Sequence, residues 1–230
     1  MARYIKVLFA ALLLLGCTPK DSIDNFTAYV DPKIGTGGHG HVFVGANVPF
    51  GLVQLGPTSI PQEWDWCSGY HDSDSTVIGF SHTHLSGTGI GDLFDVTVMP
   101  VVGEVTFARG TEDDQASGLW SYADRTREIA RPGYYSVPLT RYGITAEMTA
   151  TNRVGLHRYT FPKSEESAIV IDLQNGGCWD KPTETFIEAC GDNAVQGYRY
   201  SKGWANAQRI YFYAEFSKPF EDIHIHSVDY

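Results

Sequence analysis

The residues best suited to chemistry lie in one stretch, 64–95, which reads WDWCSGYHDSDSTVIGFSHTHLSGTGIGDLFD. It combines two tryptophans, a cysteine, three histidines and five acidic residues with many small residues. A buried core of this composition would need a hydrogen-bond partner for every polar group. A site for a polar ligand uses aromatic faces for stacking and convergent polar groups for orientation, and glycines let the backbone approach the ligand. The stretch therefore predicts one wall of a sugar-binding cleft.

Ten residues are candidates for sugar contact. Trp64 and Trp66 share a face if the chain is extended, and we expect one of them to pack in the core and the other to stack on a sugar ring. Cys67 fits either a small buried packing residue or a small contact in the pocket, and a nucleophilic role is disfavoured because no activating base accompanies it. The full set is Trp64, Trp66, Cys67, Gly69, Tyr70, His71, His39, His82, His84 and Asp92.

Two H-x-H pairs raise the possibility of a metal site. His39 and His41 would share one face of an extended strand, and so would His82 and His84. Four histidines could bind zinc. We favour hydrogen-bonding groups on the floor of a polar cleft, because zinc sites need a fixed set of supporting partners. No metal ligand is assigned in this chain. The glycines of 35–45 lack the Lys-Ser/Thr of a phosphate-binding loop, so nucleotide binding is not expected.

Two aspartate pairs could formally provide an acid and a base for glycoside hydrolysis, which needs two carboxyl groups. Asp72 and Asp74 are more typical of turns and loops. Asp92 and Asp95 are expected to stabilise the glycine-rich loop that precedes them. No catalytic residue is therefore assigned in this chain.

The first 17 residues read as a secretion signal. A basic start is followed by an apolar run, Val7 to Leu15, that is too short for a bilayer, which takes about 20 residues. The sequence from Leu14 to Cys17 resembles a bacterial lipobox, which predicts cleavage before Cys17 and a lipid on its sulfur. A plain signal peptide is the alternative. Residues 18–27 would then be a tether and 28–230 the domain of an exported, membrane-anchored lipoprotein in the periplasm or at the cell surface.

Composition narrows the class of partner. The chain has 230 residues and a formal net charge of −10, and an acidic surface argues against nucleic acid or anionic membrane as a partner.

Export permits disulfides. Cys178 and Cys190 could form one, although their spacing does not fix the geometry.

Period-2 patterning dominates from Gly133 onward, and no segment shows sustained helical periodicity. Many short strands with turn residues between them favour an all-β fold, an antiparallel β-sandwich. Residues 109–131 read as a loop with one helical turn, and 176–191 as a hairpin loop. Residues 28–34 are expected to form an edge strand or an entry segment. Strands are expected at 48–55, 95–101, 103–107, 134–139, 144–150, 155–161, 168–173, 195–200, 208–216 and 223–228.

Several long motifs resemble the N-terminal domain of glycoside hydrolase family 92, the calcium-dependent, inverting exo-α-mannosidases. They are the stretch 64–95 together with GTGGHGHVFVGANVPFGLVQLGP (35–57), RPGYYSVPL (131–139), TATNRVGLHRYTFP (149–162) and GWANAQRIYFYAEFSKPF (203–220). The resemblance implies a galactose-mutarotase-like supersandwich. In the family, a helical (α/α)6 domain follows and carries the acid, the base and most calcium ligands.

The resemblance also implies a function. This chain would be the substrate-shaping part of an exo-α-1,2-mannosidase acting on N-glycan or mannan α-mannosides. It would lack the (α/α)6 catalytic domain and would be inactive alone. Its partners would be an α-mannoside oligosaccharide and its own C-terminal catalytic domain, and its cofactor would be Ca2+, with ligands outside this chain. The alternative is a free-standing carbohydrate-binding lipoprotein.

Overall fold

The computed structural model describes residues 25–114, 116–174, 176 and 179–227. The chain divides into two units, Met1–Val30 and Asp31–Tyr230. The described part of the first unit includes the 3-10 helix η1 (Phe26–Tyr29). No helix among the described residues is both long enough and apolar enough to cross a bilayer.

The predicted leader, with Cys17, lies outside the described residues, as does most of the predicted tether. The tether boundary at 27 falls inside η1, and the second unit begins at Asp31 rather than at Ala28. The edge strand considered for 28–34 does not form, because the chain forms η1 and then a turn there, which leaves the alternative of an entry segment.

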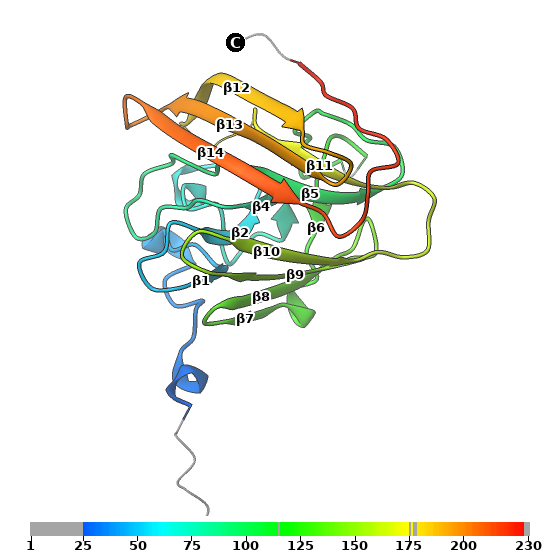
Figure 1. The fold of residues 1–230 in the computed structure, drawn as a ribbon. Coiled ribbons are helices and arrows are strands. Elements are labelled where there is room, and N and C mark those ends of the chain that lie inside the picture. Colours follow the sequence, from blue (N-terminus) through cyan, green and yellow to red (C-terminus); the bar gives the residue numbers. More distant parts are fainter. Residues whose placement is uncertain (1–24, 115, 175, 177–178, 228–230) are drawn as a thin grey trace, which may run out of the picture. The chain divides into compact units, whose positions relative to one another are not determined.

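The second unit is built from antiparallel strands in four sheets. Figure 1 shows three tiers within this unit: the four-stranded sheet, then the five-stranded sheet, then the three-stranded sheet. The antiparallel all-β class predicted from the sequence is thereby confirmed. The five-stranded sheet has the order β1 (Ala46–Asn47), β2 (Gln54–Thr58), β4 (Gly79–Ser81), β5 (Thr97–Val102), β11 (Ser167–Asp172). The four-stranded sheet has the order β10 (Gly155–Thr160), β9 (Ile144–Ala150), β8 (Tyr134–Leu139), β7 (Ile129–Arg131). The three-stranded sheet consists of β12 (Lys181–Ala189), β13 (Ala194–Lys202) and β14 (Gln208–Glu215), and the two-stranded sheet of β3 (Thr76–Val77) and β6 (Ser121–Tyr122). Three further 3-10 turns are η2 (Gly38–Gly40), η3 (Trp64–Trp66) and η4 (Arg125–Arg127).

The main core lies between the five-stranded and four-stranded sheets. Strand β9 shows why: Ile144, Ala146 and Met148 are buried, whereas the residues between them are more exposed, as expected when alternate side chains point to opposite faces. They pack with Leu55 and Phe80 of the five-stranded sheet in one hydrophobic cluster. Each fully buried large apolar side chain contributes about 1.5–3 kcal/mol, so this cluster is what holds the two sheets together.

A buried ion cluster connects the three-stranded sheet to the rest of the unit. Arg199 of β13 donates to Asp95 at 2.7 Å, to Asp180 at 2.6 Å and to the carbonyl of Leu173 at 2.9 Å. The side chains of Arg199, Asp95 and Asp180 are all fully buried. Each charge therefore depends on the others, because a buried charge without a partner is strongly destabilising.

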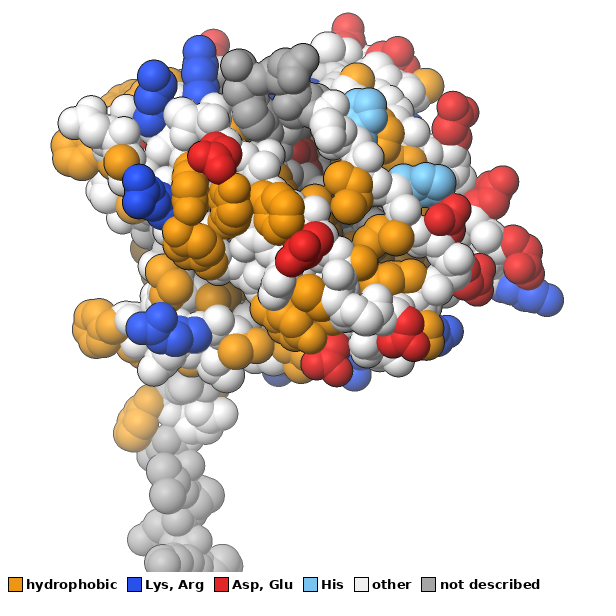
Figure 2. Space-filling model, turned by 45° about the horizontal axis from the view of Figure 1, so that its top comes forward, with side chains coloured by type: hydrophobic (Ala, Val, Ile, Leu, Met, Phe, Trp, Pro, Cys, Tyr) orange, Lys and Arg blue, Asp and Glu red, His pale blue; other side chains and the backbone are white. Residues whose placement is uncertain are grey.

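The outer face of the three-stranded sheet carries aromatic side chains. Phe186, Tyr198 and Tyr211 lie opposite one another across β12, β13 and β14, and Tyr200 and Tyr213 lie on the same face two residues further along their strands. In Figure 2, where this side of the molecule comes forward, hydrophobic side chains gather with acidic ones among them.

Several boundaries differ from the sequence prediction. Residues 176–191 were expected to form a hairpin loop, yet β12 pairs along its whole length with β13, interrupted by one irregularity at Pro182. Residues 223–227 and 103–107 alternate in sequence but form no strand, and the apolar run 48–53 forms none either. Alternation alone does not make a strand, because a strand also needs a neighbouring edge to pair with. The turn expected within 109–131 is η4, and β6 and β7 flank it. Cys178 lies outside the described residues, and Cys190 carries a free thiol.

Replacing Arg199 by methionine should lower the free energy of unfolding by about 3–5 kcal/mol, because Asp95 and Asp180 would keep buried charges without their counter-ion. Urea unfolding of the purified chain, followed by tryptophan fluorescence, measures the change. The matched control is Arg158→Met, since Arg158 pairs with Glu147 at 2.5 Å but remains exposed; it should cost about 0–1 kcal/mol. Equal losses in the two variants would contradict the importance of the buried cluster.

Candidate functional site

The two tryptophans at the start of the predicted stretch lie on the 3-10 turn η3, not on extended chain. They therefore do not share a face, contrary to the expectation from their spacing. The indole of Trp64 is 52% exposed, and its Nε1–H donates to the carbonyl of Gly89 at 2.9 Å. The ring is thus held at one edge while much of its surface faces outward.

Trp66 faces a different environment. Its Nε1–H donates to a carboxylate oxygen of Asp74 at 2.7 Å, and its ring stacks on that of His71, with centroids 4.4 Å apart. The geometry gives Trp66 the packing role that was expected for one of the two tryptophans, and leaves Trp64 as the candidate for stacking on a sugar.

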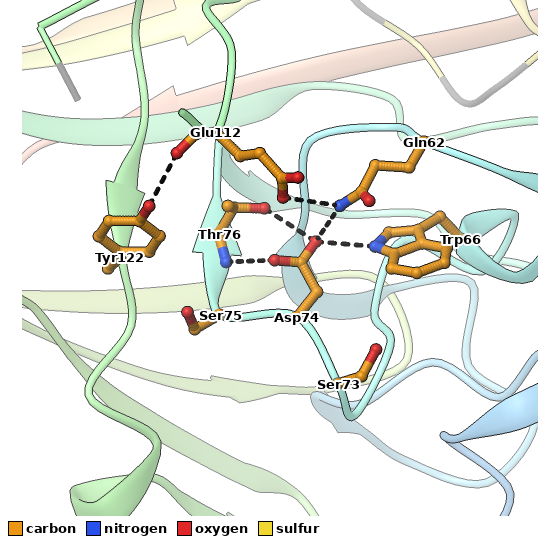
Figure 3. A pocket seen from close by; sticks show the side chains of 8 residues that line it. All are labelled: Gln62, Trp66, Ser73, Asp74, Ser75, Thr76, Glu112 and Tyr122. Carbon is orange, nitrogen blue, oxygen red and sulfur yellow. Dashed lines mark hydrogen bonds between the residues drawn. The ribbon is translucent and has the colours of Figure 1, made fainter. Parts of the chain in front are cut away.

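Figure 3 shows the polar hollow of ≈ 250 Å³ beside Trp66, with Asp74 at its centre. The Asp74 carboxylate accepts hydrogen bonds from the Thr76 N–H and hydroxyl, from Trp66 and from the Gln62 amide. Its oxygens are occupied by structural partners, so Asp74 orders the loop, as expected from the sequence, and is not free to act as an acid or base. Eight residues line the hollow: Gln62, Trp66, Ser73, Asp74, Ser75, Thr76, Glu112 and Tyr122.

His39 and His41 meet at Asp65, beside Trp64. One oxygen of Asp65 lies 2.7 Å from Nδ1 of His39 and 3.1 Å from Nε2 of His41. The hydrogen bond from His39 lowers the pKa of the Asp65 carboxyl. His41 is buried, has a left-handed backbone with φ 54°, and packs against the indole of Trp64 at 4.3 Å between centroids.

Gly89 makes room for this arrangement. A Cβ at Gly89 would lie 2.9 Å from the ring of Trp64 and 3.2 Å from His41, and its φ of +64° is one that other residues rarely adopt. The glycine-rich loop can therefore pass directly under the indole.

His82 and His84 lie elsewhere and do not join the first pair. Their Nδ1 atoms are each 2.7 Å from a backbone carbonyl, that of Val96 for His82 and that of Gln54 for His84. Nε2 of His82 lies 3.0 Å from Nε2 of His157 on β10. The four-histidine site considered from the sequence does not form. Burial lowers the pKa of His84 to about 4 and that of His157 to about 3, and it also lowers the pKa of His82.

The end of the glycine-rich loop is held under strain. Leu93, Phe94 and Val96 all have positive φ, between 53° and 78°, which is unusual for such residues and especially for a β-branched one. Asp92 accepts hydrogen bonds from the backbone N–H groups of Trp204 and Ala205, both at 3.0 Å. Together with the Asp95–Arg199 pair this confirms that the two aspartates stabilise the loop.

The remaining candidates support the surface from below. Cys67, Tyr70, His84 and Asp92 are almost fully buried, and the Tyr70 hydroxyl donates to Glu128 at 3.2 Å. Gly69 has φ +87°, and a Cβ there would press on Phe94 and His84 at 3.1–3.2 Å. These residues hold the loops in place in this structure, and their direct contact with a sugar stays a prediction.

Sequence reasoning did not select three residues at this surface. Asp65 joins the two histidines. Trp204 is exposed, and its backbone N–H donates to the Asp92 carboxylate. Trp179 is half-exposed, and its backbone N–H donates to the carbonyl of Gly91 at 3.0 Å. A tryptophan flanked by small residues, as in GWANA, was the signal available for Trp204. The buried Nε2 of His71 has no hydrogen-bond partner among the residues that the structure describes.

Within the described residues, His39, His41 and Asp65 form the one group of three or more His, Cys, Asp or Glu side chains that could hold a metal ion. Two imidazole nitrogens and one carboxylate do not suit calcium, which takes 6–8 oxygen ligands. This part of the chain therefore offers no fit for the calcium ion that the family resemblance implies.

A protein-family model and a curated protein both match this chain. The model of the glycosyl hydrolase family 92 N-terminal domain matches residues 29–229. A curated protein of Arthroderma benhamiae, described as an uncharacterized secreted glycosidase, is 32% identical over 155 residues, which are 63% of this chain and 19% of that protein.

Several solved structures of family GH92 proteins are also similar to this chain. A family GH92 alpha-mannosidase from Bacteroides thetaiotaomicron, in complex with mannoimidazole, is 39% identical with a TM-score of 0.83, over 86% of this chain and 26% of that one. The GH92 family glycosyl hydrolase ccman5 is 28% identical with a TM-score of 0.68, over 82% and 26% of the two chains. The likeness to a GH92 inverting mannosidase from the same Bacteroides species, at 23% identity and a TM-score of 0.62, concerns the fold alone. This chain thus spans about a quarter of the length of these solved relatives.

The buried histidines make stability depend on pH. An unfolded histidine takes up a proton as the pH falls through about 6.5, whereas His84 and His157 stay neutral in the folded chain until about pH 4 and 3. The unfolded state then binds more protons, so stability should fall below about pH 6.5 by about 1.4 kcal/mol per pH unit for each such histidine. Urea unfolding at about pH 7, 6 and 5 measures this slope.

The variant His157→Gln should have a shallower slope by about one proton, which is about 1.4 kcal/mol per pH unit. The exposed His224, changed to glutamine, serves as the control and should keep the parent slope. A slope that is the same in parent and His157→Gln would show that His157 is protonated in the folded chain.

Proposed function

The chain belongs to glycosyl hydrolase family 92 and contains the N-terminal domain that is typical of this family, and we propose that this domain shapes the substrate site of an α-mannosidase. The observation that carries the proposal is the position of Trp64. An indole that is 52% exposed, fixed at its N–H by Gly89, lies beside the polar groups of His39 and Asp65. An aromatic face next to hydrogen-bonding groups is the combination that binds the apolar face and the hydroxyls of a sugar.

The acid and base are proposed to come from outside the described residues. Inverting hydrolysis needs two carboxyl groups about 6.5–9.5 Å apart on opposite sides of the bond. In this chain Asp74, Asp92 and Asp95 are buried and engaged by structural hydrogen bonds. The solved family members at 28–39% identity are about four times as long as the part that matches this chain, which leaves room in such a polypeptide for a catalytic domain.

That catalytic domain is the proposed partner. The exposed aromatic side chains on the outer face of β12–β14, among them Tyr211 and Tyr213, give an apolar surface of the kind that packs against another part of a protein. Calcium, if the enzyme uses it, would be held by oxygen ligands of that partner domain, because the described residues offer only the histidine-rich group.

The finer specificity is proposed from the sequence motifs. The WDWCSGYH segment supports action on α-1,2-linked mannosides, such as N-glycan or mannan branches, with release of one mannose from the chain end. Export is supported by the likeness to a curated secreted glycosidase, and lipid attachment at Cys17 by the lipobox-like segment.

Replacing Trp64 by alanine, in the polypeptide that combines this domain with the catalytic domain, should lower kcat/KM for an α-mannoside about 5- to 30-fold. Loss of ring stacking removes about 1–2 kcal/mol of substrate binding. Steady-state kinetics with p-nitrophenyl α-mannoside measures this. The control is Phe107→Ala, because Phe107 is 53% exposed, much like Trp64, but lies in the segment between β5 and β6. Unchanged kinetics in Trp64→Ala would remove the cleft-wall role.

The 230-residue chain alone should release no mannose from p-nitrophenyl α-mannoside, with or without added calcium. It should nevertheless bind mannose-containing ligands weakly, which isothermal titration calorimetry measures. Turnover by the pure chain above the spontaneous rate would show that the acid and base lie within these residues.

A further inference from the structure

We propose that His39, His41 and Asp65 form a binding site for a zinc ion. Two segments about 25 positions apart in the sequence converge here, the turn η2 with its C-cap His41 and the turn η3. The donor atoms of the three side chains, one per residue, all lie within 4.8 Å of one another.

The distances suit a tetrahedral ion. With zinc bonds of about 2.0–2.2 Å, neighbouring ligand atoms are about 3.3–3.5 Å apart. One Asp65 oxygen is 2.7 Å from His39 Nδ1 and 3.1 Å from His41 Nε2, and the two ring nitrogens lie within 4.8 Å of each other. A movement of the His39 ring that lengthens its contact with Asp65 and adjusts its distance to His41 would admit the ion. His39, with its side chain 78% exposed, can make this movement without disturbing the core.

The other two ligands are already fixed. The ring of His41 is buried against Trp64, and its backbone carbonyl accepts a hydrogen bond from the Gly87 N–H at 2.6 Å. Asp65 is on η3, where the backbone N–H of the C-cap Cys67 donates to the carbonyl of the first residue, Trp64, at 3.0 Å. Because two of the three ligands are already held in place, only the exposed His39 side chain loses conformational freedom when the ion binds, which keeps the entropic cost of binding small.

The donor set selects zinc over the hard cations. Imidazole nitrogens with one carboxylate suit zinc and similar transition metals, whereas calcium and magnesium prefer oxygen ligands alone. Binding requires a lone pair on Nδ1 of His39 and on Nε2 of His41, and each neutral ring provides it when its proton is on the other nitrogen. Three protein ligands leave a fourth position open for water or for a hydroxyl of a bound molecule.

A bound zinc ion would cross-link η2 to η3 directly beside the indole of Trp64. It would therefore fix the part of the surface to which the proposed function assigns sugar contact. The site itself does not depend on that function, because metal binding can be measured without any sugar and without the catalytic domain.

Titration of zinc chloride into the purified metal-free chain, followed by calorimetry, should give one ion per chain. His39→Ala and Asp65→Asn should each weaken zinc binding at least about tenfold, the scale expected for a damaged metal site. The control is His224→Ala. His224 also contacts a carboxylate, that of Asp222 at 2.9 Å, and both side chains are exposed, but this pair lacks a second histidine. Its loss should leave zinc affinity unchanged.

A second measurement keeps the test independent of folding. Cobalt(II) added in place of zinc should give visible absorption typical of a tetrahedral site with nitrogen and oxygen ligands in the parent and in His224→Ala, and lose it in His39→Ala. Because His39 is exposed, that variant should keep the parent urea midpoint. Binding that is absent in the parent, or unchanged in both His39→Ala and Asp65→Asn, would overturn the proposal.

Discussion

The buried guanidinium of Arg199 is the contact on which the rest of the unit depends. It comes from β13 and reaches Asp95, Asp180 and the carbonyl of Leu173, all without contact with solvent. Such a charge is tolerated only when all of its partners are in place. The three-stranded sheet, the end of β11 and the end of the glycine-rich loop must therefore be positioned together.

This constraint explains the strained backbone next to it. Leu93, Phe94 and Val96 adopt positive φ values around Asp95, at a cost of about 1–3 kcal/mol each. The ion cluster on one side and the Asp92 contacts with the Trp204 segment on the other hold them there. The result is a glycine-rich loop whose path is fixed at its end, so that the carbonyl of Gly89 meets the indole of Trp64.

The site that emerges is suited to binding rather than to proton transfer. Its outward-facing groups are an indole and an imidazole, while the nearby carboxylates of Asp74 and Asp92 are consumed by structural hydrogen bonds. The exception is Asp65, whose carboxylate is shared by two histidines at the surface. This distribution supports the proposed division of roles, in which this domain orients a ligand and another part of the polypeptide supplies the acid and the base.

The sequence by itself determined the fold class and most strands of the four-stranded sheet, and it pointed to the stretch that carries the candidate site, because period-2 burial and clustered rare residues are local signals. Strands β8 and β9 were predicted to the residue. Tertiary structure alone decided the rest. The spacing of Trp64 and Trp66 suggested one shared face, but a 3-10 turn separated them, and β12 became a strand only because β13 offers it an edge. Asp65 meeting His39 and His41, and His82 meeting His157, are contacts between distant segments, which packing creates and no local pattern encodes.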